Sequence, residues 1–436
     1  MLDSRALTRI QSITLVAIIV IAALGFALIY FFWNPHSGDV IKIGFLGDID
    51  NVSGKAVLQG AILAAEQVNA EGGVLGKQII IVTEDDDSES QQFDVTFATN
   101  ALTKLIKSDK VDFLFSSNQL IPMLYQDICA EQNMIFFSMG INDQMTQRVA
   151  DDYNRYKGFF RAITNTSSAV RGLTDSFNTL RDYTGFNKIA YLTMDLPAAT
   201  NFTSRVVDSL AEQGFEIVYE NTFPPTTIDF SSYFAAIEES EAEIVGPLVP
   251  GDSSISFVKE YYDRQSPFVI WGNVNLASDS DFWQLTDGKC ESVSFVGYPV
   301  VSGYPLTSKV IPMREAYLEQ WGEIPSGGSA YSYDLIRFIL PDAIKRAGTT
   351  ETEAVISTLE ETDVETVLAR HFIYTSNHDV FVGKAGPNIP TEDYLLVCLF
   401  QWQNGIQVPV YPSEIMEEAR VTYNFPDWAG PWEDIS

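Results

Sequence analysis

The feature that most constrains the fold is a regular alternation of short apolar segments with amphipathic segments, which runs through most of the chain after residue 40. This alternation is typical of parallel β-sheets covered by helices on both faces, so the sequence predicts an α/β fold. A first series of strands is expected at 41–47, 78–83, 111–115 and 134–138. After Phe159 to Ala162 the pattern starts again, with strands expected at 188–193, 216–222, 244–248, 268–272 and 294–297. Two such series predict two similar lobes.

A specific turn follows the first expected helix. It reads Asn69-Ala70-Glu71-Gly72-Gly73-Val74-Leu75-Gly76, and a strand and an acidic loop, Glu84 to Asp87, come after it. In this order and this turn the chain resembles the extracytoplasmic solute-binding proteins of ABC importers, in particular the branched-chain amino-acid-binding (leucine-binding-like) family. Members usually carry Asn-x-x-Gly-Gly-(Ile/Val)-x-Gly here. The resemblance implies the type 1 periplasmic-binding fold, in which two Rossmann-like lobes with parallel sheets are joined by a three-strand hinge.

Three crossings between the lobes, which the resemblance implies, set the expected domain boundaries. Residues 1–38 should form a cytoplasmic stub and membrane anchor, and 39–162 the first lobe, completed by about 303–374. Residues 163–302 should form the second lobe, completed by about 375–412. The tail, 413–436, has no clear periodicity, and the sequence leaves open whether it packs on the second lobe or extends freely. A hinge of three strands would let the lobes close on a ligand.

The N-terminal segment predicts where the protein resides. Ile13 to Trp33 is a 21-residue run without a charged side chain, and at about 1.5 Å per residue it would cross the roughly 30 Å hydrocarbon core. Arg5 and Arg9 precede it, which places the N-terminus in the cytoplasm and the bulk of the chain outside a single-pass anchor. A cleaved secretory signal is the alternative, although its apolar core is usually shorter. No cysteine lies near Gly25 to Ser37, which excludes a lipoprotein-type cleavage there.

Charge and cysteine content narrow the possible partners. A net charge of −31 argues against a nucleic-acid partner, because phosphates of like charge would be repelled. Cys129, Cys290 and Cys398 are odd in number and far apart, so buried free thiols are predicted in preference to a disulfide or a metal site. The acidic cluster from Glu84 to Asp87 is interpreted as a solvated turn, with a cation site as the alternative.

Ligand-binding residues are expected where parallel strands end, because ligands bind outside the carboxyl ends of the strands in such sheets. In the first lobe this rule selects Ser116, Ser117 and Asn118 after one strand, and Ser138, Gly140 and Asn142 after the next. In the resembled family the first loop holds the ligand's carboxylate and the second takes part in binding its amino group. Serine and asparagine are also favoured helix caps, so that alternative stays open.

The second lobe offers weaker candidates: Asp195, Val249 and Asn273, each just after an expected strand. In the amino-acid binders a glutamate near Asn273 neutralises the ligand's ammonium group, and this chain lacks it. An enclosed ammonium without a carboxylate would carry several kcal/mol of uncompensated desolvation, which argues against a zwitterionic amino acid. Asp48, after the first strand, could supply the missing charge or simply cap the next helix.

The sequence and the resemblance together predict a membrane-anchored solute-binding protein. It would capture a small polar ligand, such as an amino acid or an amide, and deliver it to the permease subunits of an ABC importer, without catalysis or a cofactor. There is no glycine-rich phosphate loop, Gly-x-Ser-x-Gly elbow or His-Glu-x-x-His motif, and the three histidines do not suggest a metal site. The alternatives are an extracellular sensor acting through a partner chain and an extracellular hydrolase, for which we find no nucleophile and base.

Overall fold

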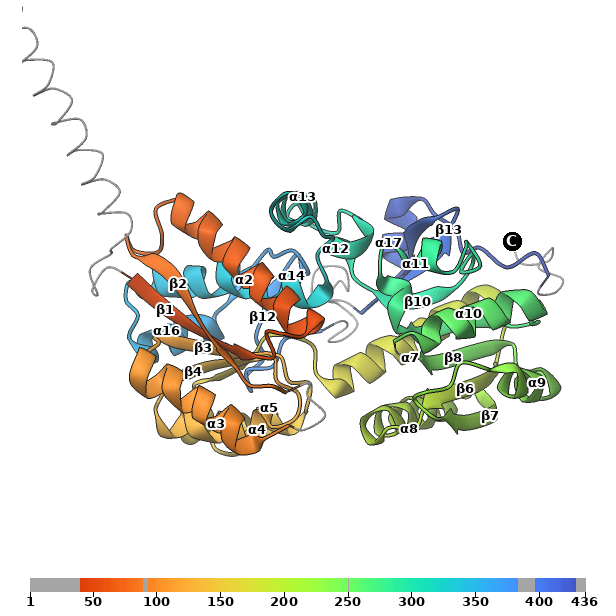
Figure 1. Cartoon of the computed structure of the whole chain (residues 1–436), viewed down its shortest axis with the longest axis horizontal. Helices are drawn as coiled ribbons and strands as arrows, with labels where there is room; N and C mark the ends of the chain where they lie inside the picture. The colour runs from red at the N-terminus through yellow and green to blue at the C-terminus, as the bar shows by residue number, and fades with distance from the viewer. Residues whose placement is uncertain (1–39, 89–92, 250, 383–396, 429–436) are drawn as a thin grey trace, which may run out of the picture.

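Two lobes lie side by side, each with a β-sheet covered by helices (Figure 1). The computed structural model describes residues 40–88, 93–249, 251–382 and 397–428. The expected membrane helix at 13–33 lies outside these residues. Within them, no helix combines the length and the apolar character that a membrane span requires. The α/β class and the two lobes predicted from the sequence are confirmed.

Lobe one is built on a five-stranded sheet in the order β2-β1-β3-β4-β5, in which all neighbouring strands run parallel. Its elements are β1 (Val40–Gly47), α2 (Val52–Ala70), β2 (Gln78–Asp85), α3 (Val95–Lys104) with a π-helical turn (Leu105–Asp109), β3 (Phe113–Ser116), α4 (Pro122–Glu131), β4 (Ile135–Ser138), α5 (Gln144–Asp151), α6 (Tyr153–Tyr156) and β5 (Phe159–Arg161). Since β2 and β3 flank β1 on opposite sides, the topological switch point lies between β1 and β3, where a ligand crevice is expected.

The turn that carried the family resemblance joins α2 to β2. The Asn69 side chain bonds both backbone groups of Ile79, accepting from its nitrogen at 2.7 Å and donating to its carbonyl at 2.8 Å. Gly72, Gly73 and Gly76 have φ angles of 102°, 79° and 77°, in the region that favours glycine. The motif therefore fixes the end of α2 against the edge strand of the sheet.

Lobe two contains a seven-stranded sheet in the order β14-β13-β10-β9-β8-β6-β7. Its elements are α7 (Thr166–Thr184), β6 (Lys188–Met194), α8 (Pro197–Glu212), β7 (Glu216–Phe223), α9 (Ser231–Glu239), β8 (Ile244–Val249), α10 (Ser253–Arg264), β9 (Val269–Val274), a 3₁₀ turn (Asn275–Ser278), α11 (Phe282–Leu285), β10 (Ser294–Gly297), α12 (Pro299–Ser302), β13 (Cys398–Gln403), β14 (Ile406–Tyr411) and α17 (Ser413–Ala419). The sheet is mixed, because β13 pairs antiparallel with both β10 and β14. The predicted parallel pairing holds from β10 to β7, and the hairpin-linked strands β13 and β14 extend the βα series at this edge.

Between β10 and β13 the chain returns to lobe one. The returning elements are α13 (Val310–Trp321), α14 (Gly327–Asp334) with a π-helical turn (Leu335–Ile339), α15 (Leu340–Ala347), α16 (Thr352–Glu360), β11 (Asp363–Val364) and β12 (Phe372–Ile373). Helix α14 packs closely on α2, since a Cβ on Gly60 would lie 2.1 Å from the Ser329 carbonyl oxygen, and the Ser332 hydroxyl donates to the Val57 carbonyl at 2.6 Å.

The segment after β12 runs beside β5. The His378 carbonyl accepts from the Arg161 backbone nitrogen at 3.1 Å, and the His378 ring stacks on Phe160 with 4.1 Å between centroids. The segment therefore lies against lobe one at His378, while the Val382 carbonyl already accepts from Arg171 of α7 in lobe two at 2.9 Å.

Within the described residues of the tail, the segment 421–428 packs on lobe two. The Tyr423 ring lies 5.5 Å from Trp271, and Trp428 lies 5.2 Å from Tyr262. The buried Gln401 side chain accepts from the Asn424 nitrogen at 2.8 Å and donates to its carbonyl at 2.9 Å. Residues 421–428 thus form a strap that covers one end of lobe two. The three cysteines are buried and free, as predicted.

Candidate ligand-binding site

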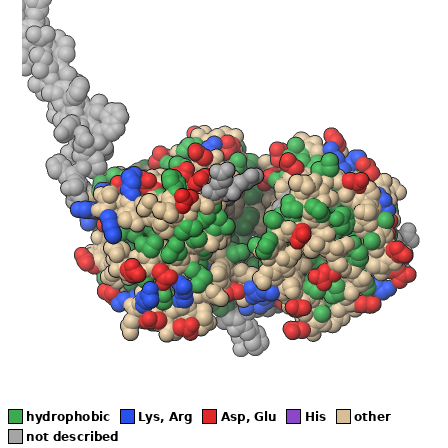
Figure 2. All heavy atoms as spheres, turned by 60° about the horizontal axis from the view of Figure 1, so that its bottom comes forward, with side chains coloured by type: hydrophobic (Ala, Val, Ile, Leu, Met, Phe, Trp, Pro, Cys, Tyr) green, Lys and Arg blue, Asp and Glu red, His purple; other side chains and the backbone are tan. Residues whose placement is uncertain are grey.

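The largest described cavity lies between the lobes, and Figure 2 shows the hollow that separates them. It has a volume of about 620 Å³. Lobe one contributes Val52, Ser53 and Ala56 from the first turns of α2, together with Gly322 to Gly328 ahead of α14. Lobe two contributes Ser278 to Asp281, which follow β9, and Tyr298, which follows β10. These segments lie beyond the carboxyl ends of strands of both sheets, where the topology expects a ligand. We call this space the interlobe cavity.

The electrostatics of the interlobe cavity differ between its walls. On the lobe-one side the N-termini of α2 and α14 meet the cavity, and helix N-termini favour anionic groups. On the lobe-two side lie Asp279 and Asp281, whereas Glu323 belongs to the lobe-one lining. Burial raises the pKa of Asp279, and the charge of Asp281 adds to the shift. One wall therefore suits a carboxylate or carbonyl oxygen and the opposite wall a cationic or amide N–H group.

Of the residues predicted in the first loop, Ser117 is the accessible one. Ser116 is buried and its hydroxyl accepts from the Asn118 nitrogen at 3.1 Å. Ser117 is half-buried, and its hydroxyl sits against Gly47, where a Cβ would lie 2.2 Å from it. Asn118 is buried, and its side-chain oxygen accepts from the nitrogens of Leu120 and Ile121, both at 2.8 Å, in the turn that leads into α4.

The Asn118 amide also takes part in a buried network centred on Asp86. The Asp86 carboxylate accepts from Asn118 Nδ2 at 2.8 Å and from the Tyr125 hydroxyl at 3.1 Å. Asp86 is fully buried, and burial together with the Asp86 charge raises the pKa of Tyr125. The interpretation of Glu84 to Asp87 as a solvated turn is therefore wrong for Asp86, which satisfies polar groups inside lobe one.

The second predicted loop presents Asn142 at its surface. Ser138 is buried and its hydroxyl accepts from the Gly140 nitrogen at 2.9 Å. Gly140 is also buried. The Asn142 side chain is exposed and accepts from the Gln144 nitrogen at 2.9 Å, in the turn that leads into α5. Asn118 and Asn142 therefore each stabilise the turn ahead of a helix, although neither is the capping residue of that helix.

The remaining predicted residues are spread over the two lobes. Asp48 is mostly buried and accepts from the Asn51 nitrogen at 3.0 Å, just before α2. Asp195 is exposed after β6, and Asn273 is half-buried on β9. The Val249 side chain is fully buried in the lobe-two core. The interlobe cavity is lined by other residues: within the described part of the chain, its lining includes neither these four residues nor the six predicted in the loops after β3 and β4.

Sequence reasoning missed the cavity-lining residues. Strand β9 continues to Val274, beyond the end expected at residue 272, so its loop begins later and carries Asp279 and Asp281. The serine- and aspartate-rich segment Ser278 to Asp281 was a signal for this loop. The segment Gly322 to Gly328 gave no comparable signal, because it reaches the cavity only after the chain has returned to lobe one.

Large apolar side chains are exposed at the same strand ends. Val52 is 84% exposed and Ile228 77% exposed. The exposed apolar residues that follow β1, β3, β4, β6 and β7 are Val52, Leu120, Ile141, Leu196 and Ile228. Both lobes thus present apolar surface at the edges from which ligand loops project, and such surface commonly marks a binding region.

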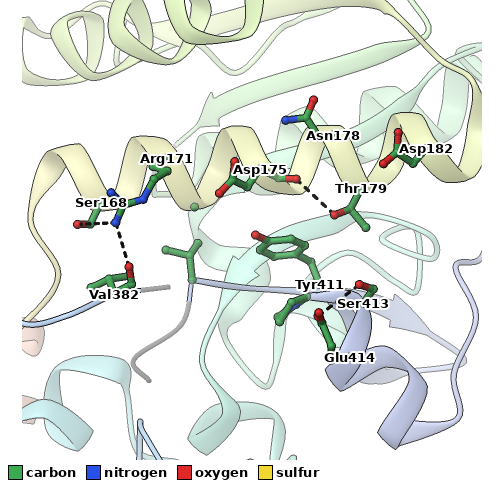
Figure 3. A pocket seen from close by; sticks show the side chains of 13 residues that line it. Ser168, Arg171, Asp175, Asn178, Thr179, Asp182, Val382, Tyr411, Ser413 and Glu414 are labelled. Carbon is green, nitrogen blue, oxygen red and sulfur yellow. Dashed lines mark hydrogen bonds between the residues drawn. The ribbon is translucent and has the colours of Figure 1, made fainter. Parts of the chain in front are cut away.

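A second cavity, of about 250 Å³, lies along α7 and is lined mainly by polar side chains, as Figure 3 shows. Arg171 donates to the Val382 carbonyl at 2.9 Å at one end, and Tyr411 and Glu414 lie opposite the helix. Val382 and Val397 border residues 383–396, which lie outside the described part of the chain. We therefore assign no ligand to this cavity.

Comparison with known proteins gives the family. The profile of the periplasmic binding protein family matches residues 40–383. The Leu/Ile/Val-binding protein homolog 7 of Brucella abortus is 22% identical over 393 residues, which cover 87% of this chain and 93% of that protein. The structure of a putative branched-chain amino acid ABC transporter protein from Silicibacter pomeroyi has a TM-score of 0.78 and 17% identity, covering 89% of this chain and all of that one.

A solute binding protein of an ABC transporter from R. palustris, solved in complex with benzoate, has a TM-score of 0.64 and 17% identity, and covers 85% of this chain and 95% of that one. The relatives are solute-binding proteins, which confirms the expectation of a binding protein rather than an enzyme. Because the family profile matches most of its length, this chain belongs to the periplasmic binding protein family.

Proposed function

We propose that the protein captures a small polar ligand between its two lobes, closes on it and delivers it to the permease subunits of an ABC importer. The observation that carries this proposal is the interlobe cavity, which is bounded by strand-end loops from both lobes. A ligand there would contact both lobes at once, so binding energy favours the closed arrangement. The apolar side chains exposed at the strand ends would lose solvent contact on closure, which adds to the driving force.

The proposed ligand is an amino acid, an amide or a related compound. The helix N-termini of the interlobe cavity suit its carboxylate or carbonyl group. Asp279 and Asp281 suit an ammonium or amide group, and so replace the glutamate that the family's amino-acid binders carry near Asn273. The R. palustris relative holds benzoate, which has no ammonium group, so ligands without that charge are also part of the proposal.

The residues predicted from the strand ends keep distinct roles in this proposal. Ser117 and Asn142 are the accessible side chains of their loops, and we propose that they reach the ligand when the lobes close. The buried Ser116, Asn118, Ser138 and Gly140 would hold those loops in shape. Asp48, Asp195, Val249 and Asn273 mark the ends of strands β1, β6, β8 and β9, where the loops of the cleft begin.

We further propose that residues 13–33 anchor the protein in the membrane with its N-terminus in the cytoplasm, as their length and flanking arginines favour. Lobe one would consist of residues 40–162 with about 303–382, and lobe two of residues 163–302 with 397–428. The three connections between the lobes would form the hinge.

The test is a thermal-shift screen of the full chain in detergent against amino acids, amides, urea, small peptides, polyamines and carboxylates. A ligand at a hundred times its dissociation constant should stabilise the protein by about 2.7 kcal/mol. A hit that also shortens the distance between labels on the two lobes supports capture by closure. Stabilisation without any change in that distance would contradict it.

A further inference from the structure

A buried ion pair ties lobe one to the connections between the lobes. Arg161, the last residue of β5, is fully buried. Its Nε lies 2.8 Å from Oδ1 of Asp379, on the segment that leads toward the third crossing. Burial lowers the pKa of the Arg161 guanidinium, and the Asp379 charge opposes that shift. A buried charge of this kind is stable only where its partners are held in place.

The other end of the guanidinium holds the loop after β4. Arg161 Nη1 donates to the Gly140 carbonyl, and Nη2 donates to the Asn142 carbonyl at 2.8 Å. These are the backbone groups of the loop that presents Asn142 to the cleft. Because the guanidinium is planar and rigid, its three nitrogens fix the loop and Asp379 in one mutual geometry.

The second oxygen of Asp379 extends these contacts to lobe two. Asp379 Oδ2 accepts from the Thr146 hydroxyl at 3.1 Å and from the Asn165 amide. Asn165 lies on the first crossing, and its side-chain oxygen caps α7 by accepting from the Ser168 nitrogen at 2.6 Å. Arg161, Asp379, Thr146 and Asn165 thus form a continuous set of contacts, which we call the hinge clasp.

The loop also bonds directly to the first turn of α7. The Ile141 carbonyl accepts from the Thr166 nitrogen at 2.9 Å and from its hydroxyl at 3.0 Å. Any displacement of residues 140–142 is therefore opposed both by Arg161 and by the helix that begins lobe two.

We propose that Arg161 is a positioning residue of the hinge: through the hinge clasp it sets the orientation of the two lobes in the ligand-free protein and ties that orientation to the loop at residues 140–142. The proposal rests on the proposed function only in that the lobes move relative to each other. It assigns Arg161 no contact with the ligand, since its side chain is enclosed.

The experiment measures the distance between the lobes without any ligand. Spin labels are placed on Asn100→Cys of α3 and Glu239→Cys of α9, both exposed helical sites in different lobes. The three native cysteines are buried and leave the labelling specific. Double electron–electron resonance on the full chain in detergent then gives the distribution of interlobe distances.

The main variant is the double change Arg161→Met with Asp379→Leu. It removes both charges of the pair, so that neither charge is left buried without its partner. We expect cooperative unfolding to be retained while the distance distribution broadens and its mean shifts. Arg161→Lys, which keeps the charge but not the planar fork, should give an intermediate distribution. The matched control is Arg148→Met, which breaks a pair with Asp127 within lobe one and should leave the distribution unchanged.

A purely structural role would lower the unfolding midpoint of the Arg161 variants and leave their distance distribution superimposable on that of the parent protein. That result would overturn the proposal. The interlobe distances are measured without a ligand. A negative ligand screen would therefore contradict the proposed function and leave the test of Arg161 unaffected. If the double variant does not fold, the distance distribution of Arg161→Lys tests the proposal instead: an altered distribution supports it, and an unchanged one overturns it.

Discussion

Asp143 of lobe one and Arg205 of lobe two form an ion pair, with 3.0 Å between Oδ2 and Nη1. The Ser167 hydroxyl bridges them, since it donates to Asp143 Oδ2 at 2.9 Å and accepts from Arg205 Nη2 at 2.6 Å. The pair thus links the lobes beside the first crossing, at a place that stays open to solvent.

Replacing Arg205 with methionine should lower the free energy of unfolding by less than about 1 kcal/mol, because about a third of each side chain is exposed and water screens the pair. Urea unfolding at low and at high salt measures the effect, which should shrink in high salt. Arg264→Met, which breaks a pair with Glu238 inside lobe two, is the control. A loss of several kcal/mol for Arg205→Met alone would show that the link between the lobes is stronger than a surface pair.

Asn118→Ala should destabilise lobe one by about 1–3 kcal/mol, because it leaves the buried Asp86 carboxylate with one fewer donor. Chemical denaturation of the full chain measures this loss. Ser117→Ala, one residue away and half-buried, should change stability little. Equal stability of the two variants would exclude the structural role assigned to the Asn118 amide.

Asp334 should make stability depend on pH. Burial raises the pKa of Asp334 to about 7, although its carboxylate accepts from the Val367 nitrogen at 2.7 Å and the Leu368 nitrogen at 3.1 Å. Between about pH 4 and pH 7 the folded protein then holds a proton that the unfolded chain has released, so stability falls as the pH rises through this window. The loss amounts to at most about 4 kcal/mol.

Unfolding free energies measured at pH 5, 6 and 7 test this dependence. Asp334→Asn should flatten the slope across the window, whereas Asp342→Asn, at an exposed pair with Arg346, should not. An identical slope in the parent protein and Asp334→Asn would assign the pH dependence to other groups.

Asp279→Asn with Asp281→Asn should weaken ligands that carry an ammonium group and spare those that do not. We expect a roughly tenfold increase in the dissociation constant, equivalent to about 1.4 kcal/mol. Isothermal titration of screen hits with and without an amino group measures the contrast, and Asp287→Asn on the lobe-two surface is the control. Equal weakening of both ligand classes would argue that these carboxylates shape the cavity without contacting the charge.

Ser117→Ala with Asn142→Ala should weaken binding without unfolding either lobe, because both side chains are accessible at strand ends. Affinity for a screen hit, together with the unfolding midpoint, separates the two effects. Unchanged affinity would place the ligand wholly in the interlobe cavity, away from the loops after β3 and β4.

Much of the fold was predictable from the sequence, because each central strand is an apolar run between polar turns. Strands β1, β6 and β10 lie within one residue of their expected bounds. The periodicity of the sequence alone favours a start of α2 near Ala56, but the helix begins at Val52, because the Asn51 side chain caps it a turn earlier by accepting from the Ser53 nitrogen. Local capping of this kind is decided by side-chain geometry that periodicity does not encode.

The site was harder to predict, because non-local packing decides which polar side chains reach the cleft. Asn118 and Ser117 are neighbours of similar polarity, yet the Asp86 network draws one into the interior and leaves the other accessible. The interlobe cavity combines residues near 52, 280 and 325, which are brought together only by the return of the chain to lobe one.

The strap formed by residues 421–428 has a consequence for biosynthesis. It is synthesised after every strand that it covers, yet Tyr423 shields Trp271 and Asn424 satisfies the buried Gln401. A chain that stopped at Ala419 would leave an aromatic surface and a buried amide uncovered, and so remain open to proteases and to aggregation. The aromatic core at this end of lobe two is therefore complete only once the chain has been synthesised through residue 428.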